Sequence, residues 1–440
     1  WNFLNMNYRK ILILSLPSML AVGLEPVAEL IDTIFLGQKN TLWVSGLGAT
    51  NSILISLTWV FNFLSYGVTA RIGRAFGSRD FNQIGSLLST ALLLSFTIGI
   101  ILSLPLLLSD HYILSQWYNL KNETLRDAKL YWNIRLIAYP LTLISMTLIG
   151  ILRGLQKIRA TLWIVASNTI VNALFTYSLV FPMDIGIQGA AIGTVCGFFI
   201  STLLGLFFVY QEIKKHSIPL FLQFNTKVFI HFGKDAIHLF ARTGLLTLSF
   251  FILTIAVAKL GPFYLASHQI ALQLWLFSAF LLDGFAIIGT SYGSPLLGQK
   301  KFAEFRDLSK KLFILGILTG ILISLIFVGF KGSLFKVFSQ DPKVHLLLGQ
   351  IFLLLSLSQP LNAMVYISDG LIFASSSIKV LRNGMLFGFF ILFLPIVVVS
   401  YYWFPKLENF WWALIFLNCS RLFFSLRFLG RGRHVPYEGS

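Results

Sequence analysis

The sequence predicts an all-α membrane protein with twelve transmembrane helices, arranged as two lobes of six helices each. Three observations predict this fold. First, 56% of the residues are apolar and only 12% are charged, whereas soluble domains carry roughly 25% charged residues. Second, apolar segments of about 20 residues, long enough for a helix to cross the hydrocarbon core, recur along the chain. Third, basic residues gather in small clusters between these segments, as they do in cytoplasmic loops.

The apolar segments give the predicted helices in order. In the first half they cover 11–36, 44–69, 84–108, 130–152, 160–181 and 187–210. In the second half they cover 236–258, 263–289, 312–330, 347–372, 383–402 and 409–426. Both termini are expected in the cytoplasm, because most Lys and Arg residues then fall in inside loops.

The polar stretch 212–235 is predicted to be a cytoplasmic linker between an N-terminal lobe, 1–211, and a C-terminal lobe, 236–440. A short internal repeat supports this division. The segment 77–81 follows the second span, and the similar segment 298–302 follows the eighth, 221 residues later. Since six is an even number, both halves enter the membrane from the same side. A pseudo-two-fold axis along the membrane normal is therefore expected.

The formal net charge of +17 does not indicate nucleic-acid binding, because the charge is divided among the loops. The two cysteines, Cys196 and Cys419, lie in apolar segments, and no His/Cys cluster indicates a metal site. The sequence has no glycine-rich loop for nucleotide phosphates and no constellation of nucleophile and base. We therefore expect neither an enzyme nor a cofactor.

Three carboxylates interrupt the first apolar segment. Glu25, Glu29 and Asp32 lie four and three residues apart, on one face of a helix. A charge at membrane depth is costly unless it is paired, protonated or facing water, so Asp32 is the first candidate for binding a proton or cation. Pro17 and Pro26 interrupt the same helix and are expected to let it bend. This combination predicts movement driven by ion binding.

A second group of polar residues lies on the fifth and sixth predicted spans. Asn168, Asn172 and Thr176 follow one another at four-residue spacing, and Thr194 adds another hydroxyl. Neutral oxygens of this kind can bind Na⁺ or hydrogen-bond a carboxylic acid. A single hydroxyl in a membrane helix more often bonds to its own backbone. Tyr131, at the start of the fourth predicted span, is as consistent with an anchor at the membrane surface as with a role in this polar site.

Purely structural alternatives exist for the acidic residues. Asp32 could pair with a buried arginine, either Arg135 or Arg242. Asp283 and Asp369 lie near the cytoplasmic ends of their spans, where we expect pairing with Lys or Arg from the loops.

Short motifs occur in most of the predicted spans. They are the run 25–33 followed by Gly37, Tyr131-x3-Arg135, Gly150-x3-Gly154, Asn168-x3-Asn172, and Gly189-Ala190-Ala191-x2-Thr194. In order and spacing these resemble the motifs of the multidrug and toxic compound extrusion (MATE) transporters. Ala241-Arg242-Thr243 and the run 282–286 resemble the DinF-like branch of that family.

The resemblance implies a V-shaped bundle of two lobes that exports drugs in exchange for H⁺ or Na⁺. The cation- or proton-binding residues that it implies are Asp32, Tyr131, Asn172 and Thr194. The residues expected around them are Glu29, Asn168 and Thr176. The proline about which the first helix bends corresponds to Pro17. Relatives often carry a second Asp where this chain has Thr176, which slightly favours H⁺ as the coupling ion.

The sequence therefore predicts a secondary active exporter of amphipathic or cationic compounds, monomeric, in the bacterial inner membrane. The expected partners are the small-molecule substrate, the coupling ion and the lipid bilayer. One alternative is a flippase for lipid-linked saccharides, but its cavity should be strongly cationic and only three Arg lie within the spans. A less favoured alternative is a membrane scaffold without transport activity.

Overall fold

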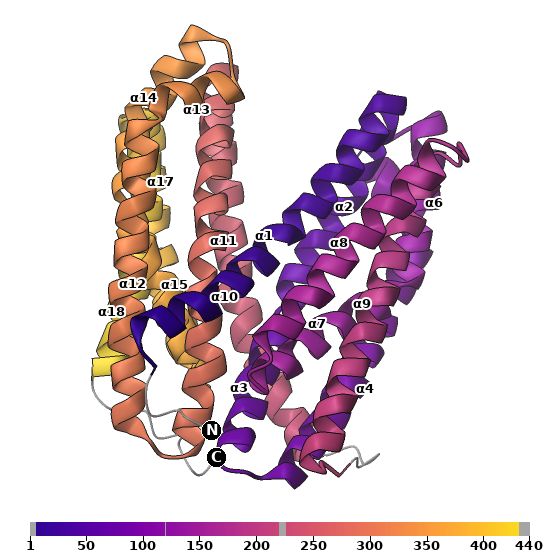
Figure 1. Ribbon diagram of the computed structural model, residues 1–440. Coiled ribbons are helices and arrows are strands. Elements are labelled where there is room, and N and C mark those ends of the chain that lie inside the picture. The colour runs from indigo at the N-terminus through magenta and orange to yellow at the C-terminus, as the bar shows by residue number, and fades with distance from the viewer. Residues whose placement is uncertain (1–5, 119, 220–225, 431–440) are drawn as a thin grey trace. The chain divides into compact units, whose positions relative to one another are not determined.

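The computed structural model describes residues 6–118, 120–219 and 226–430, and every regular element in these ranges is a helix (Figure 1). In this part of the chain, nine helices are long and apolar enough to cross a membrane. The number rises to eleven if each of two bent helix pairs forms one span. The predicted all-α membrane fold is confirmed.

The helices of the first half follow the predicted order. They are α1 (Tyr8–Lys39), α2 (Thr41–Phe61), α3 (Phe63–Gly77), α4 (Phe81–Leu108), α5 (Asp110–Tyr112), η2 (Ile113–Trp117), α6 (Asn122–Ile137), α7 (Tyr139–Gly154), α8 (Ile158–Val180) and α9 (Ile187–His216). Apolar side chains dominate these helices, and hydroxyl side chains within them mostly donate to the backbone one turn earlier, as Thr50 does to Gly46.

The second half repeats this pattern. Its helices are α10 (Thr226–Ala258), α11 (Pro262–Gly298), α12 (Phe302–Gly329), α13 (Lys331–Phe338), α14 (Pro342–Leu357), α15 (Gln359–Ala374), α16 (Ile378–Phe387), η3 (Gly388–Phe393), α17 (Leu394–Trp403) and α18 (Leu407–Gly430).

Several predicted spans are interrupted in the structure. The predicted span 44–69 is divided between α2 and α3. Helices α6 and α7 meet at a bend of 47°, and α14 and α15 meet at a bend of 49°. Pro140 and Pro360 lie in the first turns of α7 and α15, where a proline causes a bend because it lacks the N–H that would continue the preceding helix.

The chain divides into two compact units, and the division passes through α1. Leu20–Ala236 forms the first unit. Residues up to Met19 group with those from Ile237 onward and form the second unit. The start of α1 packs tightly on α11, since a Cβ added to Gly284 would lie 3.0 Å from the Met19 nitrogen. The stretch expected to be a linker, 212–235, belongs to the first unit and is helical over Glu212–His216 and Thr226–Asp235.

The same helix-packing contact occurs once in each unit. In the first, the Thr69 hydroxyl of α3 donates to the Gly150 carbonyl of α7 at 2.9 Å. In the second, the Thr290 hydroxyl of α11 donates to the Gly370 carbonyl of α15 at 2.9 Å. The two threonines are 221 residues apart, the offset of the sequence repeat. Both contacts depend on glycine, because a Cβ at either Gly150 or Gly370 would collide with the backbone of the partner helix.

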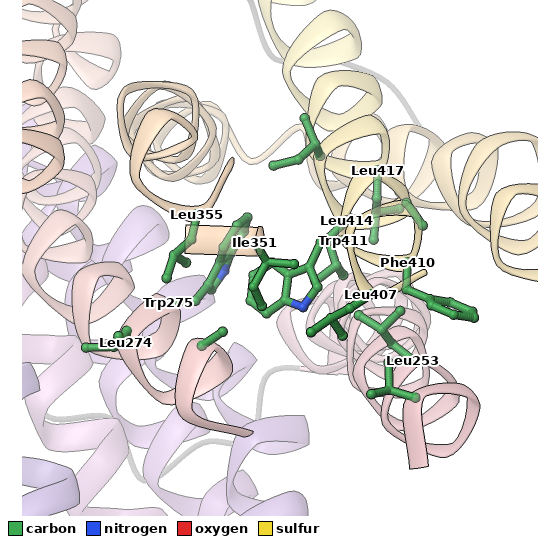
Figure 2. Close-up of a cluster of buried hydrophobic side chains, with 14 of the residues drawn as sticks. Leu253, Leu274, Trp275, Ile351, Leu355, Leu407, Phe410, Trp411, Leu414 and Leu417 are labelled. Carbon is green, nitrogen blue, oxygen red and sulfur yellow. The ribbon is translucent and has the colours of Figure 1, made fainter. Parts of the chain in front are cut away.

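An aromatic and aliphatic core holds α11, α14 and α18 together in the second unit (Figure 2). Trp275 and Trp411 are both almost fully buried, and their ring centroids lie 5.7 Å apart in an edge-on arrangement. The His268 ring meets the other side of Trp411 at 5.8 Å. This densely packed region contrasts with the polar centre of the first unit.

Candidate functional site

The first unit has a buried carboxylate at its centre. Asp32 lies on α1, is only 3% exposed, and points toward α8 and α9. Ionised carboxylates are rarely buried so deeply unless they are paired or hydrogen-bonded. The side chains that contact Asp32 therefore decide what it can do.

Three neutral donors surround the Asp32 carboxylate. The Thr176 hydroxyl donates to Oδ1 at 2.9 Å. The Asn172 amide and the Thr194 hydroxyl donate to Oδ2 at 3.3 and 3.2 Å. The Asn172 amide also donates to the Thr194 oxygen at 2.9 Å. Asp32, Asn172 and Thr194, which the sequence motifs grouped together, thus lie in direct contact, and Thr176 belongs to the same contact group.

Glycines on α9 make this arrangement possible. A Cβ at Gly193 would lie 2.8 Å from the Thr176 backbone nitrogen, and one at Gly197 would lie 2.7 Å from the Asn168 carbonyl oxygen. Helices α8 and α9 can approach each other this closely only because these positions have no side chain. The close approach brings Thr194 of α9 within hydrogen-bond distance of Asn172 on α8.

Two further predicted residues lie beside this group without bonding to Asp32. The Tyr131 hydroxyl on α6 donates to Asn51 Oδ1 on α2 at 3.0 Å, and it also lies close enough to Thr194 to interact with it. Asn168 Oδ1 is buried and has no hydrogen-bond partner in the described part of the chain. Asn51 was missed by sequence reasoning because an isolated Asn some 80 residues from Tyr131 gives no signal.

The other carboxylates of the first helix are more exposed than Asp32. Glu25 and Glu29 both have exposed side chains on α1. Glu29 lies within electrostatic reach of Asp32 and of Arg135 on α6. The Arg135 guanidinium lies over the Phe198 ring at 5.7 Å, and among the described residues it forms no ion pair with Asp32. Of the three carboxylates that the sequence placed on one face of this helix, Asp32 is buried and Glu25 and Glu29 are exposed.

The expected hinge residues lie on either side of the division between the two units. Helix α1 is continuous through both Pro17 and Pro26. The boundary between the units falls after Met19, between the two prolines.

The second unit contains a carboxylate of a different kind. We expected Asp369 to pair with loop residues, but this prediction is wrong. Its Oδ2 accepts from Arg242 of α10, and from Arg421 of α18 at 2.6 Å. Both arginines come from helices, α10 and α18, and meet Asp369 at a buried position on α15. Arg421 also donates to Asn418 Oδ1 at 2.8 Å. Arg242, which the sequence suggested as a partner of Asp32, pairs with Asp369.

No group of three His, Cys, Asp or Glu side chains suitable for a metal ion occurs within residues 6–118, 120–219 and 226–430. The groups that contact Asp32 are hydroxyls and an amide. They suit a proton or an alkali cation better than a transition metal.

A buried carboxylate held by polar side chains between membrane helices is typical of ion-coupled membrane transporters. Comparison with known proteins agrees with this class. The MatE family model matches residues 17–178 and 240–399, and the chain belongs to the MATE family of transporters. It is a multi-pass membrane protein, and the family relatives are transporters rather than enzymes.

Two curated relatives illustrate the range of the family. Protein DETOXIFICATION 44, chloroplastic, of Arabidopsis thaliana is 26% identical over 405 residues, covering 89% of this chain and 76% of the relative. DNA damage-inducible protein F of Escherichia coli is 22% identical over 382 residues, covering 84% and 82%. The second match agrees with the predicted DinF-like branch.

The fold is shared with solved MATE structures, in which twelve transmembrane helices form two lobes. The Vibrio cholerae MATE transporter VcmN in the bent form superposes with a TM-score of 0.87 at 17% identity, covering 97% of each chain. The predicted fold class is thereby confirmed.

Proposed function

We propose that this protein is a secondary active exporter that exchanges amphipathic or cationic compounds for H⁺, with Asp32 as the coupling carboxylate. The observation that carries the proposal is the contact of the buried Asp32 with three neutral donors and no cationic partner among the described residues. Such a carboxylate can gain or lose a charge without breaking an ion pair. Export of drug-like compounds fits the name of one relative, the multidrug export protein MepA of Staphylococcus haemolyticus.

The proton is assigned to Oδ2 of Asp32, because Thr194, one of the two donors at this oxygen, has a second acceptor for its hydroxyl hydrogen. Thr194 has one hydroxyl hydrogen, and both Asp32 Oδ2 and the Ala190 carbonyl oxygen lie within its range, at 3.2 and 2.9 Å. When Oδ2 is protonated, the Thr194 hydroxyl turns to Ala190 and its oxygen accepts the new hydrogen bond. Among the described residues, the Thr176 hydroxyl donates to Oδ1 alone, so it remains there in both states.

Sodium would use the same residues differently. An alkali cation needs several oxygen ligands directed toward it. Asn172 Oδ1 is buried without a partner in the described chain, so rotation of this amide would present an oxygen beside Asp32 Oδ2. Sodium coupling is therefore the alternative within the same site, whereas the present orientation of the amide favours a proton.

Protonation of Asp32 weakens the attachment of α1 to α8 and α9. Hydrogen bonds to an ionised carboxylate are roughly twice as strong as those between neutral groups. When the charge is lost, the α1 segment beyond Pro26 is held less firmly, and the helix bends between Pro17 and Pro26. An ion that binds the two conformations with different affinity in this way can drive transport.

The flippase alternative is less favoured because the arginines in the spans are already engaged. Arg242 and Arg421 both bind Asp369, and Arg135 lies over Phe198. A diphosphate headgroup would need several free guanidinium or ammonium groups. The proposed transporter acts as a monomer in the bacterial inner membrane with both termini in the cytoplasm, in keeping with the basic inner loops.

The test is dye efflux from proteoliposomes that contain the full chain, under an imposed proton or sodium gradient. Asp32→Asn keeps the shape of the side chain but cannot ionise, so gradient-driven efflux of a cationic dye should fall to the rate of protein-free vesicles. Efflux in response to a proton gradient alone supports proton coupling. Efflux that requires sodium supports the alternative.

The matched control is Glu25→Gln, which neutralises an exposed carboxylate on the same helix and should retain most of the transport. Thermal unfolding of both variants in detergent verifies that they are folded. Wild-type efflux by folded Asp32→Asn protein would refute the role of Asp32.

A further inference from the structure

An open groove lies on the second unit, between α17 and α18. Its volume is about 430 Å³, within the range of roughly 300–1,000 Å³ that is typical of sites for small organic ligands. The walls are mostly apolar, from Pro395 and Val399 on α17 to Trp412 on α18. Ser400 and Asn409 are the two polar lining residues. The chemistry of the walls therefore fits a hydrocarbon chain with a polar group at one end.

The groove follows an irregular part of the predicted eleventh span. The π-helical turn η3 lies directly before α17, and Pro395 occupies the first turn of α17. Before this point the packing on α18 is tight, since a Cβ at Gly388 would lie 2.9 Å from Leu417 Cδ1. The groove opens beyond it because the wide turn and the proline interrupt the regular helix.

The length of the groove matches one leaflet of a bilayer. Eight residues separate Ile396 from Phe404, which corresponds to about 12 Å of helix at 1.5 Å per residue. Half of the hydrocarbon core of a bilayer is about 15 Å thick. The groove is thus about as long as the part of an acyl chain that lies in one leaflet.

The mouth of the groove has the features of a membrane interface. Tyr402 and Trp403 are 71% and 66% exposed at this end of α17, as in the aromatic belts of membrane proteins. Lys406 lies in the short connection between α17 and α18, with an exposed side chain. Lys259 lies over the Tyr401 ring at 5.3 Å. Glu408 is the acidic residue of the connection, so the cationic groups are in excess.

We propose that this groove binds one membrane phospholipid, with an acyl chain along α17 and α18 and the phosphate at Lys406. The apolar walls account for the chain, and the lysine ammonium groups can donate charge-assisted hydrogen bonds to the phosphate. The site is separate from Asp32, which belongs to the other unit. The proposal requires only that the protein spans a membrane.

The experiment uses the full chain in vesicles of phosphatidylethanolamine and phosphatidylglycerol, with a small fraction of phosphatidylglycerol that carries a diazirine on its acyl chain. After illumination, mass spectrometry locates the labelled peptides. We expect label to concentrate on residues 395–412. An even distribution over all lipid-facing helices would overturn the proposal, because it would show bulk lipid only.

Two pairs of variants test the two parts of the site. Val399→Trp fills the groove and should lower its labelling about tenfold, the change expected when roughly two methylene groups lose their contacts. Leu322→Trp on α12 adds the same ring at an exposed position outside the groove and should leave the labelling unchanged. Equal labelling of wild type and Val399→Trp would contradict the acyl-chain assignment.

Labelling by phosphatidylglycerol is compared with labelling by phosphatidylethanolamine that carries the same diazirine, and we expect the wild-type groove to prefer the anionic phosphatidylglycerol. Lys406→Gln should remove this preference, whereas Lys336→Gln, which changes an exposed lysine on α13, should not. An unchanged preference in Lys406→Gln would overturn the phosphate assignment. Competition of the transported dye for the groove would also refute the lipid site, because the groove would then belong to the substrate path.

Discussion

Asp32 in the first unit and Asp369 in the second are buried carboxylates that are held in opposite ways. Asp32 accepts hydrogen bonds from two hydroxyls and an amide. Asp369 accepts from two guanidinium groups, those of Arg242 and Arg421. Both side chains are almost inaccessible to water, so the difference lies in their partners rather than in their burial.

The comparison shows how a membrane protein can use the same functional group for two purposes. Neutral donors bind both forms of a carboxyl group, because a hydroxyl can turn and accept where it previously donated. Guanidinium groups only donate, and loss of the negative charge would leave two buried cations unpaired. This difference supports the proposed proton exchange at Asp32, whereas Asp369 connects α10, α15 and α18 through its two arginines.

The largest expected effect comes from breaking the connection at Asp369. Arg421→Met removes one of the two arginines that bind Asp369 and leaves Arg242 in place, so it should lower the free energy of unfolding by about 1.5–3 kcal/mol. Thermal or denaturant unfolding in detergent measures this loss. Arg427→Met on the exposed end of the same helix is the control and should change it by less than about 0.5 kcal/mol. Equal stability of the two variants would show that the Arg421 pair is not structural.

A smaller effect is expected at the donor that changes partners. Thr194→Val removes the hydroxyl that serves Asp32 Oδ2 and Ala190 in turn, and should slow gradient-driven efflux about tenfold, or ~1.4 kcal/mol in the barrier. Thr194→Ser keeps the hydroxyl and should transport at nearly the wild-type rate. Equal loss in both variants would mean that side-chain shape, and not the hydroxyl, matters at this position.

The smallest effect is expected at the other oxygen of the same carboxylate. Thr176→Val removes the donor to Oδ1, the oxygen to which the proposal assigns no proton, and should change the efflux rate by less than about threefold. The same proteoliposome assay measures it. If Thr176→Val stops transport while Thr194→Val does not, the proton resides on Oδ1, and the assignment of the two oxygens must be reversed.

Much of the fold could be predicted from the sequence, because the length of an apolar segment can be read from neighbouring residues alone. The apolar segments located the spans, but the bends at Pro140 and Pro360 and the break between α2 and α3 changed their shape. The sequence did not predict that the first part of α1 packs with the second unit while the rest of the helix belongs to the first. It depends on the packing of Met19 against Gly284, two residues that are far apart in the chain.

The candidate site was predictable in part for the same reason. Helical spacing placed Asn172 and Thr176 on one face, and the family motif added Thr194. Which helix this face meets is a tertiary property. The direct bond from Thr176 to Asp32 and the partners of Asp369 therefore emerged only in three dimensions.

The course of α1 has a consequence for dividing the chain. A gene cut between α9 and α10 would yield two polypeptides that do not correspond to the two compact units, because the second would lack the helix start that ends at Met19. Gly284 would then face an empty space where the backbone of α1 now lies. If the two halves were co-expressed, the second polypeptide could complete its compact unit only with the start of α1, which is carried by the first polypeptide.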